Sequence, residues 1–134
     1  MAILCIDDDP QFCDAIAGVL ADAGYRAVAA RTAGEGLQHA REIDLAIVDL
    51  HLRGLSGDEL VRAIREVRPI PVILTSGVPP EDGRLIARRC GAQHFLAKPF
   101  DLDELLRVVD TLLGEAKDAA REAASGAAPT KLRA

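Results

Sequence analysis

The sequence predicts an α/β protein in which five parallel strands alternate with five helices. Two observations support this class: short, continuous apolar runs recur along residues 2–114, and segments with apolar residues at helical spacing lie between them. Continuous runs, rather than alternating ones, are typical of strands that are buried on both faces, as in a parallel sheet. Regular alternation of strand and helix then predicts one sheet with helices on both faces, joined by right-handed crossovers.

The first half of the chain supplies two strands and two helices. Residues 2–6 (AILCI) and residues 27–30 (AVAA) form the expected strands. Between them, apolar residues follow Phe12 at i+4, i+7 and i+8, which is the spacing of one helix face, and Gly24 supplies a helix stop. The helix expected at 33–41 is weaker, because it contains two glycines.

The second half of the chain repeats this alternation three times. The expected strands are residues 45–48, 72–75 and 95–97. Apolar residues at helical spacing follow each strand, from Leu60 towards Pro69, around Leu85 and Ile86, and from Leu102 to Leu112.

The composition argues against several classes of function. With a net charge of −5, a pI near 5.1 and 3% aromatic residues, the chain is not expected to bind nucleic acid or a membrane surface directly. No apolar stretch approaches the ~20 residues of a membrane span, and no secretory signal is visible. Cys5, Cys13 and Cys90 show no metal-ligand spacing. We therefore expect a cytoplasmic protein with reduced thiols.

The composition changes near residue 114. Residues 1–114 are expected to form a single domain. Residues 115–134 contain eight alanines and almost no large apolar side chains. They are expected to extend the last helix as far as Ala124 and to end in a disordered tail, with no output domain.

Polar side chains gather where the expected strands end. They are an aspartate triplet after the first strand, an aspartate after the third, two hydroxyls at the end of the fourth and a lysine after the fifth: 7–9, Asp49, Thr75, Ser76 and Lys98. Because ligands of parallel sheets bind beyond the carboxyl ends of the strands, these groups are expected at one rim. Clustered carboxylates suit a hard cation such as Mg²⁺, and a lysine and a hydroxyl can hold phosphate oxygens. The rim therefore predicts a site for Mg²⁺ and a phosphoryl group, which one carboxylate could accept.

Four stretches, in this order and spacing, carry a resemblance to a known family: ILCIDDDP, LAIVDLHLRGLSGDEL, PVILTSG and FLAKPF. Together they resemble the receiver domains of bacterial two-component response regulators, over residues 2 to about 114. The resemblance implies a flavodoxin-like (βα)5 three-layer sandwich, with a five-stranded parallel sheet in the order 2-1-3-4-5. It also implies a signalling phosphoprotein, which catalyses only its own Mg²⁺-dependent phosphorylation and dephosphorylation.

The resemblance assigns partners and site residues as well. The phosphoryl donor is a phosphohistidine of a sensor histidine kinase or of a phosphotransfer protein, and Asp49 is the acceptor. Asp7, Asp8, Asp49 and the backbone carbonyl of His51 hold Mg²⁺, while Lys98 binds a phosphoryl oxygen. A downstream protein partner binds the face formed by the fourth helix, fifth strand and fifth helix.

Three further positions depend on comparison with the family pattern. Ser76, rather than Thr75, matches the hydroxyl position, since the small residue Gly77 follows it. Phe95 occupies the aromatic switch position, where tyrosine is commoner, and is expected to move between an exposed and a buried rotamer. Arg53 stands where proline is usual and adds a charge near the rim.

Other interpretations of the aspartates remain open. Asp9, followed by Pro10, is expected to cap the next helix instead of binding a metal. One alternative function is a phosphorylation-independent interaction module, although the carboxylates, hydroxyl and lysine are all present. Another is a haloacid-dehalogenase-like phosphohydrolase, whose Asp-x-Asp pair Asp7 and Asp9 imitate but whose usual cap domain has no counterpart here.

Overall fold

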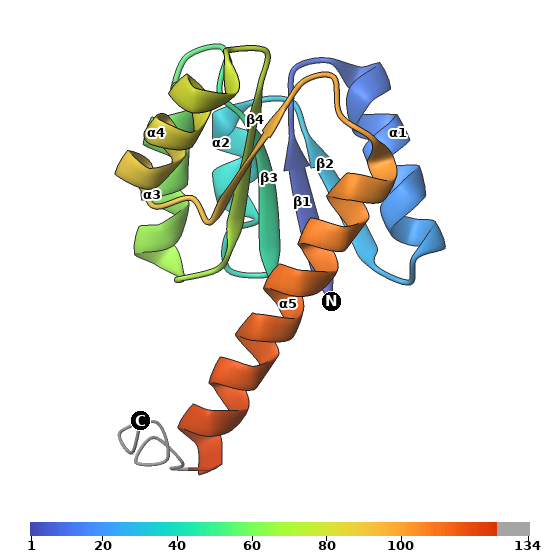
Figure 1. Cartoon of the computed structure of the whole chain (residues 1–134), viewed down its shortest axis with the longest axis vertical. Coiled ribbons are helices and arrows are strands. Elements are labelled where there is room, and N and C mark those ends of the chain that lie inside the picture. Colours follow the sequence, from blue (N-terminus) through green and yellow to red (C-terminus); the bar gives the residue numbers. More distant parts are fainter. Residues whose placement is uncertain (126–134) are drawn as a thin grey trace.

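The computed structural model describes residues 1–125 and shows strands and helices in strict alternation (Figure 1). The strands are β1 (Ala2–Ile6), β2 (Arg26–Ala30), β3 (Leu45–Asp49), β4 (Val72–Ser76) and β5 (His94–Ala97). The helices are α1 (Pro10–Asp22), α2 (Ala33–Gln38), α3 (Gly57–Val67), α4 (Pro80–Cys90) and α5 (Leu102–Ser125). The disordered tail expected at the end of the chain falls on residues 126–134, outside the described residues.

The five strands form one parallel sheet in the order β2-β1-β3-β4-β5. Both the α/β class and the strand order expected from the sequence are thereby confirmed. Asp49 and Ser76 are the last residues of β3 and β4, so each strand extends one residue beyond its expected end. The sheet itself therefore orients these two side chains, because they still belong to hydrogen-bonded strands.

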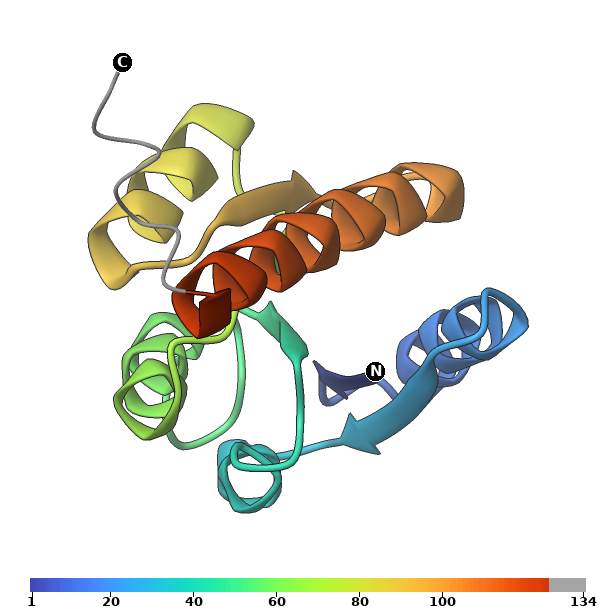
Figure 2. The ribbon, with the colours of Figure 1, turned by 90° about the horizontal axis from the view of Figure 1, so that it is seen from below.

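Two separate cores cover the faces of the sheet. Viewed from below, α1 and α5 lie on one face, and α2, α3 and α4 lie on the other (Figure 2). Along β1, Ile3 and Cys5 pack in the core beneath α1 and α5, whereas Leu4 and Ile6 pack in the opposite core. Successive residues of a strand therefore point to opposite faces of the sheet, so that each residue's position along the strand decides which of the two cores it joins.

The start of α1 separates Asp9 from the two aspartates that precede it. Asp9 is the N-cap, and its carboxylate accepts hydrogen bonds from the backbone N–H groups of Gln11 (3.0 Å) and Phe12 (3.5 Å). Pro10 occupies the first helical position, where its missing N–H costs nothing. The capping role expected for Asp9 is confirmed.

The last helix extends well beyond the sheet (Figure 1). Its first turns bury Leu105, Val109 and Leu113 against the core beneath α1. It then continues to Ser125, one residue past the end expected from the sequence. Within residues 1–125, no helix combines the length and the apolar character needed to cross a membrane.

Candidate functional site

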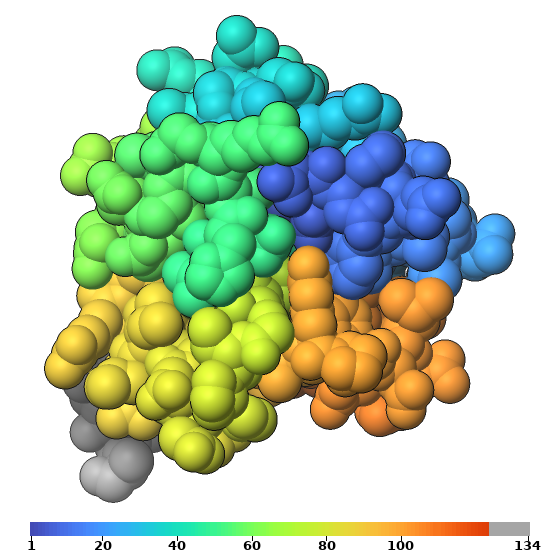
Figure 3. Space-filling view, turned by 90° about the horizontal axis from the view of Figure 1, so that it is seen from above, coloured from blue at the N-terminus to red at the C-terminus, as the bar shows by residue number. Residues whose placement is uncertain are grey.

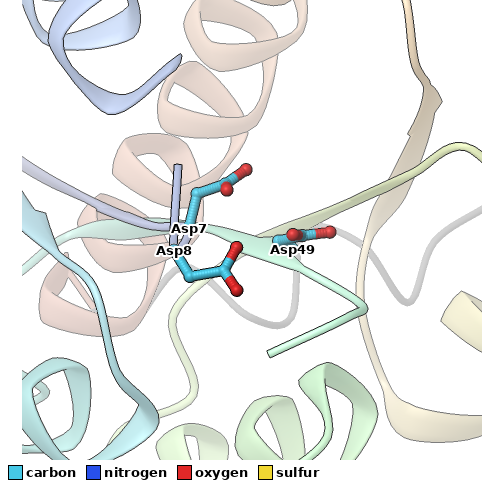
Figure 4. Close-up of side chains that lie close together, drawn as sticks. All are labelled: Asp7, Asp8 and Asp49. Carbon is cyan, nitrogen blue, oxygen red and sulfur yellow. The ribbon is translucent and has the colours of Figure 1, made fainter. Parts of the chain in front are cut away.

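Three carboxylates converge at the carboxyl ends of β1 and β3 (Figure 4). One oxygen from each of Asp7, Asp8 and Asp49 lies within 4.8 Å of the others. Asp7 and Asp49 are only 1% and 6% exposed, while Asp8 is exposed to solvent. From above, the start of α1 (blue), the loop after β3 (green) and the segment after β5 (orange) meet on this face (Figure 3).

Asp7 is held in place from three directions. Its Oδ1 accepts a hydrogen bond from the backbone N–H of Asp9 at 2.9 Å, and its Oδ2 accepts one from Lys98 Nζ at 2.8 Å. The thiol of Cys13 donates to its carbonyl oxygen at 3.4 Å. The contacts with Asp9 and Lys98 satisfy both oxygens of the buried carboxylate and fix the direction in which it points, while the thiol of Cys13 holds the backbone.

Asp49 has weaker partners than Asp7. Its Oδ1 accepts a long hydrogen bond from the backbone N–H of His51 (3.3 Å), and its Oδ2 lies 3.8 Å from Lys98 Nζ. Burial raises the pKa of Asp49 above its usual value, and the charge of Asp7 adds to this effect more than Lys98 offsets it. The ionised Asp49 is therefore short of positive charge at this rim.

Lys98 follows β5 and reaches the carboxylates of Asp7 and Asp49. Its ammonium lies 4.3 Å from the centre of the Phe12 ring, which in turn meets Phe100 edge to face. Burial lowers the pKa of Lys98, but the hydrogen bond to Asp7 and the charge of Asp49 outweigh it, so the pKa is raised. The aromatic cover was not anticipated from the sequence, where Phe12 serves only as a residue of an apolar helix face.

Arg53 and Asp8 form the solvent-exposed edge of the site. The Nε of Arg53 lies 3.9 Å from Asp8 Oδ2, and the Arg53 side chain is 92% exposed. An ion pair this exposed contributes little to stability. Arg53 can therefore leave Asp8 free to contact another group at small cost.

The two hydroxyls at the end of β4 face opposite ways. Ser76 is buried, and its Oγ accepts a hydrogen bond from the Val78 N–H at 3.2 Å, which leaves its own proton available. Thr75 is fully buried and pairs in register with Asp49, but its Oγ1 has no hydrogen-bond partner among the described residues. Alternation along the strand sets Thr75 on the face covered by α1 and α5, and Ser76 on the other.

Phe95 lies inside the protein. It is 8% exposed and belongs to the core that α4 covers, together with Leu74, Ala87 and Cys90. The buried rotamer is one of the two expected from the sequence.

The donor set fits a hard divalent cation. Asp7, Asp8 and Asp49 carry three negative charges when ionised, and Lys98 supplies one positive charge between two of them. Two of these carboxylates are almost fully buried, so the remaining negative charge is poorly screened by water. Oxygen-only ligands at such a site suit Mg²⁺ better than softer metals.

Comparison with known proteins agrees with this geometry. A family model described as the response regulator receiver domain matches residues 3–110. The nitrogen assimilation regulatory protein NtrX of Azorhizobium caulinodans is 36% identical over 116 residues, which cover 83% of this chain and 26% of NtrX. Protein PilH of Pseudomonas aeruginosa is 29% identical over 116 residues, which cover 83% of this chain and 96% of PilH.

A solved structure has the same fold over most of its length. The CheY-like response regulator receiver domain protein from Methanospirillum hungatei JF-1 superposes with a TM-score of 0.82 at 29% identity, covering 88% of this chain and 97% of that one. Several curated relatives are longer than this chain, which spans 26% of NtrX, 56% of VanRB from Enterococcus faecalis and 37% of PfeR from Pseudomonas aeruginosa.

Proposed function

Because the chain belongs to the family of response regulator receiver domains, we propose that it is a phosphoaspartate switch with Asp49 as the acceptor. The observation that carries this proposal is the cluster of Asp7, Asp8 and Asp49 around the ammonium of Lys98. A structural ion pair would need one carboxylate for one lysine. Two nearly buried carboxylates and a third at the edge provide more negative charge than folding alone requires.

Mg²⁺ would be held by Asp7, Asp8, Asp49 and the backbone carbonyl of His51. When bound, it supplies positive charge that lowers the repulsion between the incoming phosphoryl group and the acceptor. Of the three carboxylates, only that of Asp8 is exposed to solvent. Its only ion-pair partner among the described residues is the exposed Arg53.

The reaction is the transfer of a phosphoryl group from a phosphohistidine. One oxygen of Asp49 attacks phosphorus in line, the new O–P bond forms, and the N–P bond of the donor breaks as its imidazole leaves. Such transfers depend mostly on positioning and electrostatics. Lys98 takes one phosphoryl oxygen, and Ser76 donates the proton that its bond with Val78 leaves free. Water later hydrolyses the acyl phosphate and resets the protein.

The donor is a sensor histidine kinase or a histidine phosphotransfer protein, and the readout is a change in a downstream protein partner. The proposed partner face is formed by α4, β5 and α5, where a hollow of about 540 Å³ is lined by Arg84, Arg88, His94 and Glu104 among others. Neither nucleic acid nor a membrane is proposed as a direct partner, in keeping with the net charge of −5. The proposed place of action is the cytoplasm, with residues 1–114 as the receiver domain.

The test is phosphorylation by acetyl phosphate with Mg²⁺, followed by mass spectrometry of the intact protein. We expect the wild type to gain one phosphoryl group and Asp49→Asn to gain none. Asp9→Asn is the matched control, because Asp9 caps α1 and should not affect transfer. Equal labelling of wild type and Asp49→Asn would overturn the assignment of the acceptor. No labelling of the wild type would favour the phosphorylation-independent alternative.

A further inference from the structure

Gly83 is an unusual residue to find inside a helix. It lies in the first turns of α4, a helix of 11 residues, and it is buried. Glycine is the least favourable helix residue after proline. Its φ is not positive, so the backbone conformation does not require glycine there. The reason for a glycine must be the space that its missing side chain leaves.

The ring of Phe95 fills that space. A Cβ atom added at Gly83 would lie 2.1 Å from Phe95 Cζ, 2.3 Å from Cε2 and 2.4 Å from Cε1. Distances this short mean that any other residue at this position displaces the ring. The ring therefore rests directly against the bare backbone of α4, and the two residues are complementary in size.

We propose that Gly83 is a positioning residue that holds Phe95 buried both with and without a phosphoryl group on Asp49. This inference rests on the proposed function, because Phe95 is the residue expected to change its position on phosphorylation. The ring is only 8% exposed, and it rests against the backbone of α4. Phe95 therefore acts as a fixed part of the α4–β5 packing, rather than as a side chain that phosphorylation draws inward.

The chemistry of Phe95 supports the buried state. Phenylalanine has no hydroxyl group that could gain a hydrogen bond outside, so exposure of the ring brings only the loss of apolar burial. The space beside Gly83 that the ring fills, here called the slot, is bounded by the backbone of α4. It does not depend on Ser76 or Lys98. Any change that phosphorylation produces at the face formed by α4, β5 and α5 must then arise without movement of the ring.

The ring position can be measured by NMR with ring-¹³C-labelled phenylalanine. The chain has three phenylalanines, so Phe95→Leu assigns the Phe95 signal by its loss. A soluble paramagnetic agent broadens exposed rings. We expect Phe95 to be protected equally without and with Mg²⁺ and beryllium fluoride, a phosphoryl analogue. We also expect the α-protons of Gly83 to be shifted upfield by the ring. A ring that is exposed alone and becomes protected on addition of the analogue would overturn the proposal.

Two variants distinguish the effect of filling the slot from the general effect of replacing a helical glycine by alanine. Gly83→Ala should expose the Phe95 ring, whereas Gly18→Ala, at an open position in the middle of α1, should leave it protected. The double variant Gly83→Ala/Phe95→Leu should recover part of the Tm that Gly83→Ala loses, because leucine is smaller than the ring. A protected Phe95 ring in Gly83→Ala would overturn the proposal.

Two outcomes need separate treatment. If Gly83→Ala does not fold, the double variant decides: a folded double variant supports the slot, and an unfolded one overturns it. Failure of the wild type to accept a phosphoryl group would overturn the proposed function instead. The ring measurement without beryllium fluoride does not depend on that result, so the two failures are distinguishable.

Discussion

Lys98 forms its short ion pair with Asp7 and not with Asp49. Its Nζ lies 2.8 Å from Asp7 Oδ2 and 3.8 Å from Asp49 Oδ2. The lysine therefore neutralises the aspartate that is proposed to bind only metal, and leaves the proposed acceptor with a weaker partner. This arrangement keeps Asp49 available for reaction, because an acceptor locked in a tight ion pair would have to break it first.

Removing the lysine charge should destabilise the protein. In Lys98→Met the nearly buried Asp7 and Asp49 lose their shared cation. We expect the free energy of unfolding, measured in urea at pH 7, to fall by about 2–3 kcal/mol. This is less than the ~3–5 kcal/mol typical of a fully buried pair, because the lysine is partly exposed. Mg²⁺ should restore part of the loss. Lys117→Met, on the exposed part of α5, is the control and should change stability by less than about 0.5 kcal/mol.

The raised pKa of Asp49 makes a prediction about pH. A carboxyl group whose pKa is higher in the folded state than in the unfolded chain destabilises the fold once it is ionised. Its favourable contribution is complete below the unfolded value of about 3.8 and is lost as pH rises through the folded value. Asp49→Asn should therefore be more stable than the wild type at pH 7 without Mg²⁺, and the difference should shrink towards pH 4. A constant difference in Tm between pH 4 and pH 7 would contradict this.

The unpartnered hydroxyl of Thr75 should weaken the fold. Thr75→Val keeps the shape of the side chain and removes a fully buried oxygen that has no hydrogen-bond partner among the described residues. We expect the free energy of unfolding to rise by about 1–2 kcal/mol. Ser76→Ala is the matched comparison, since its Oγ accepts from Val78 and its loss should lower stability by about 1 kcal/mol. Two variants that change stability in the same direction would show that the hydroxyls do not differ as described.

Asp8 and Asp9 should have different functions, although they are neighbours in the chain. Asp9→Ala removes an N-cap and should cost about 1 kcal/mol of stability while leaving Mg²⁺ affinity unchanged. Asp8→Asn should lower Mg²⁺ affinity and leave stability unchanged, because Asp8 is exposed and its only described ion pair is the weak one with Arg53. Chemical denaturation and isothermal titration with Mg²⁺ measure the two effects separately. Loss of Mg²⁺ affinity in Asp9→Ala, with α1 intact, would contradict the division.

The sequence by itself determined the order of the strands and helices, the capping role of Asp9 and the rim at which the polar groups meet. The reason is that each rests on local information: a continuous apolar run of about five residues, a helical repeat, or a cap before proline. The alternation of strand and helix then fixes a parallel sheet, and a parallel sheet brings the ends of β1, β3, β4 and β5 to one edge.

Only the tertiary structure decided how the groups at that edge pair. Lys98 and Asp7 are 91 residues apart in the chain, and which of two aspartates the ammonium contacts depends on differences of about 1 Å. The fit of Phe95 against Gly83 likewise depends on how closely α4 packs on β5. Periodicity shows which face of an element is buried, but not what it touches. Those contacts arise from close packing in three dimensions, where a single methyl group at Gly83 would exclude the ring.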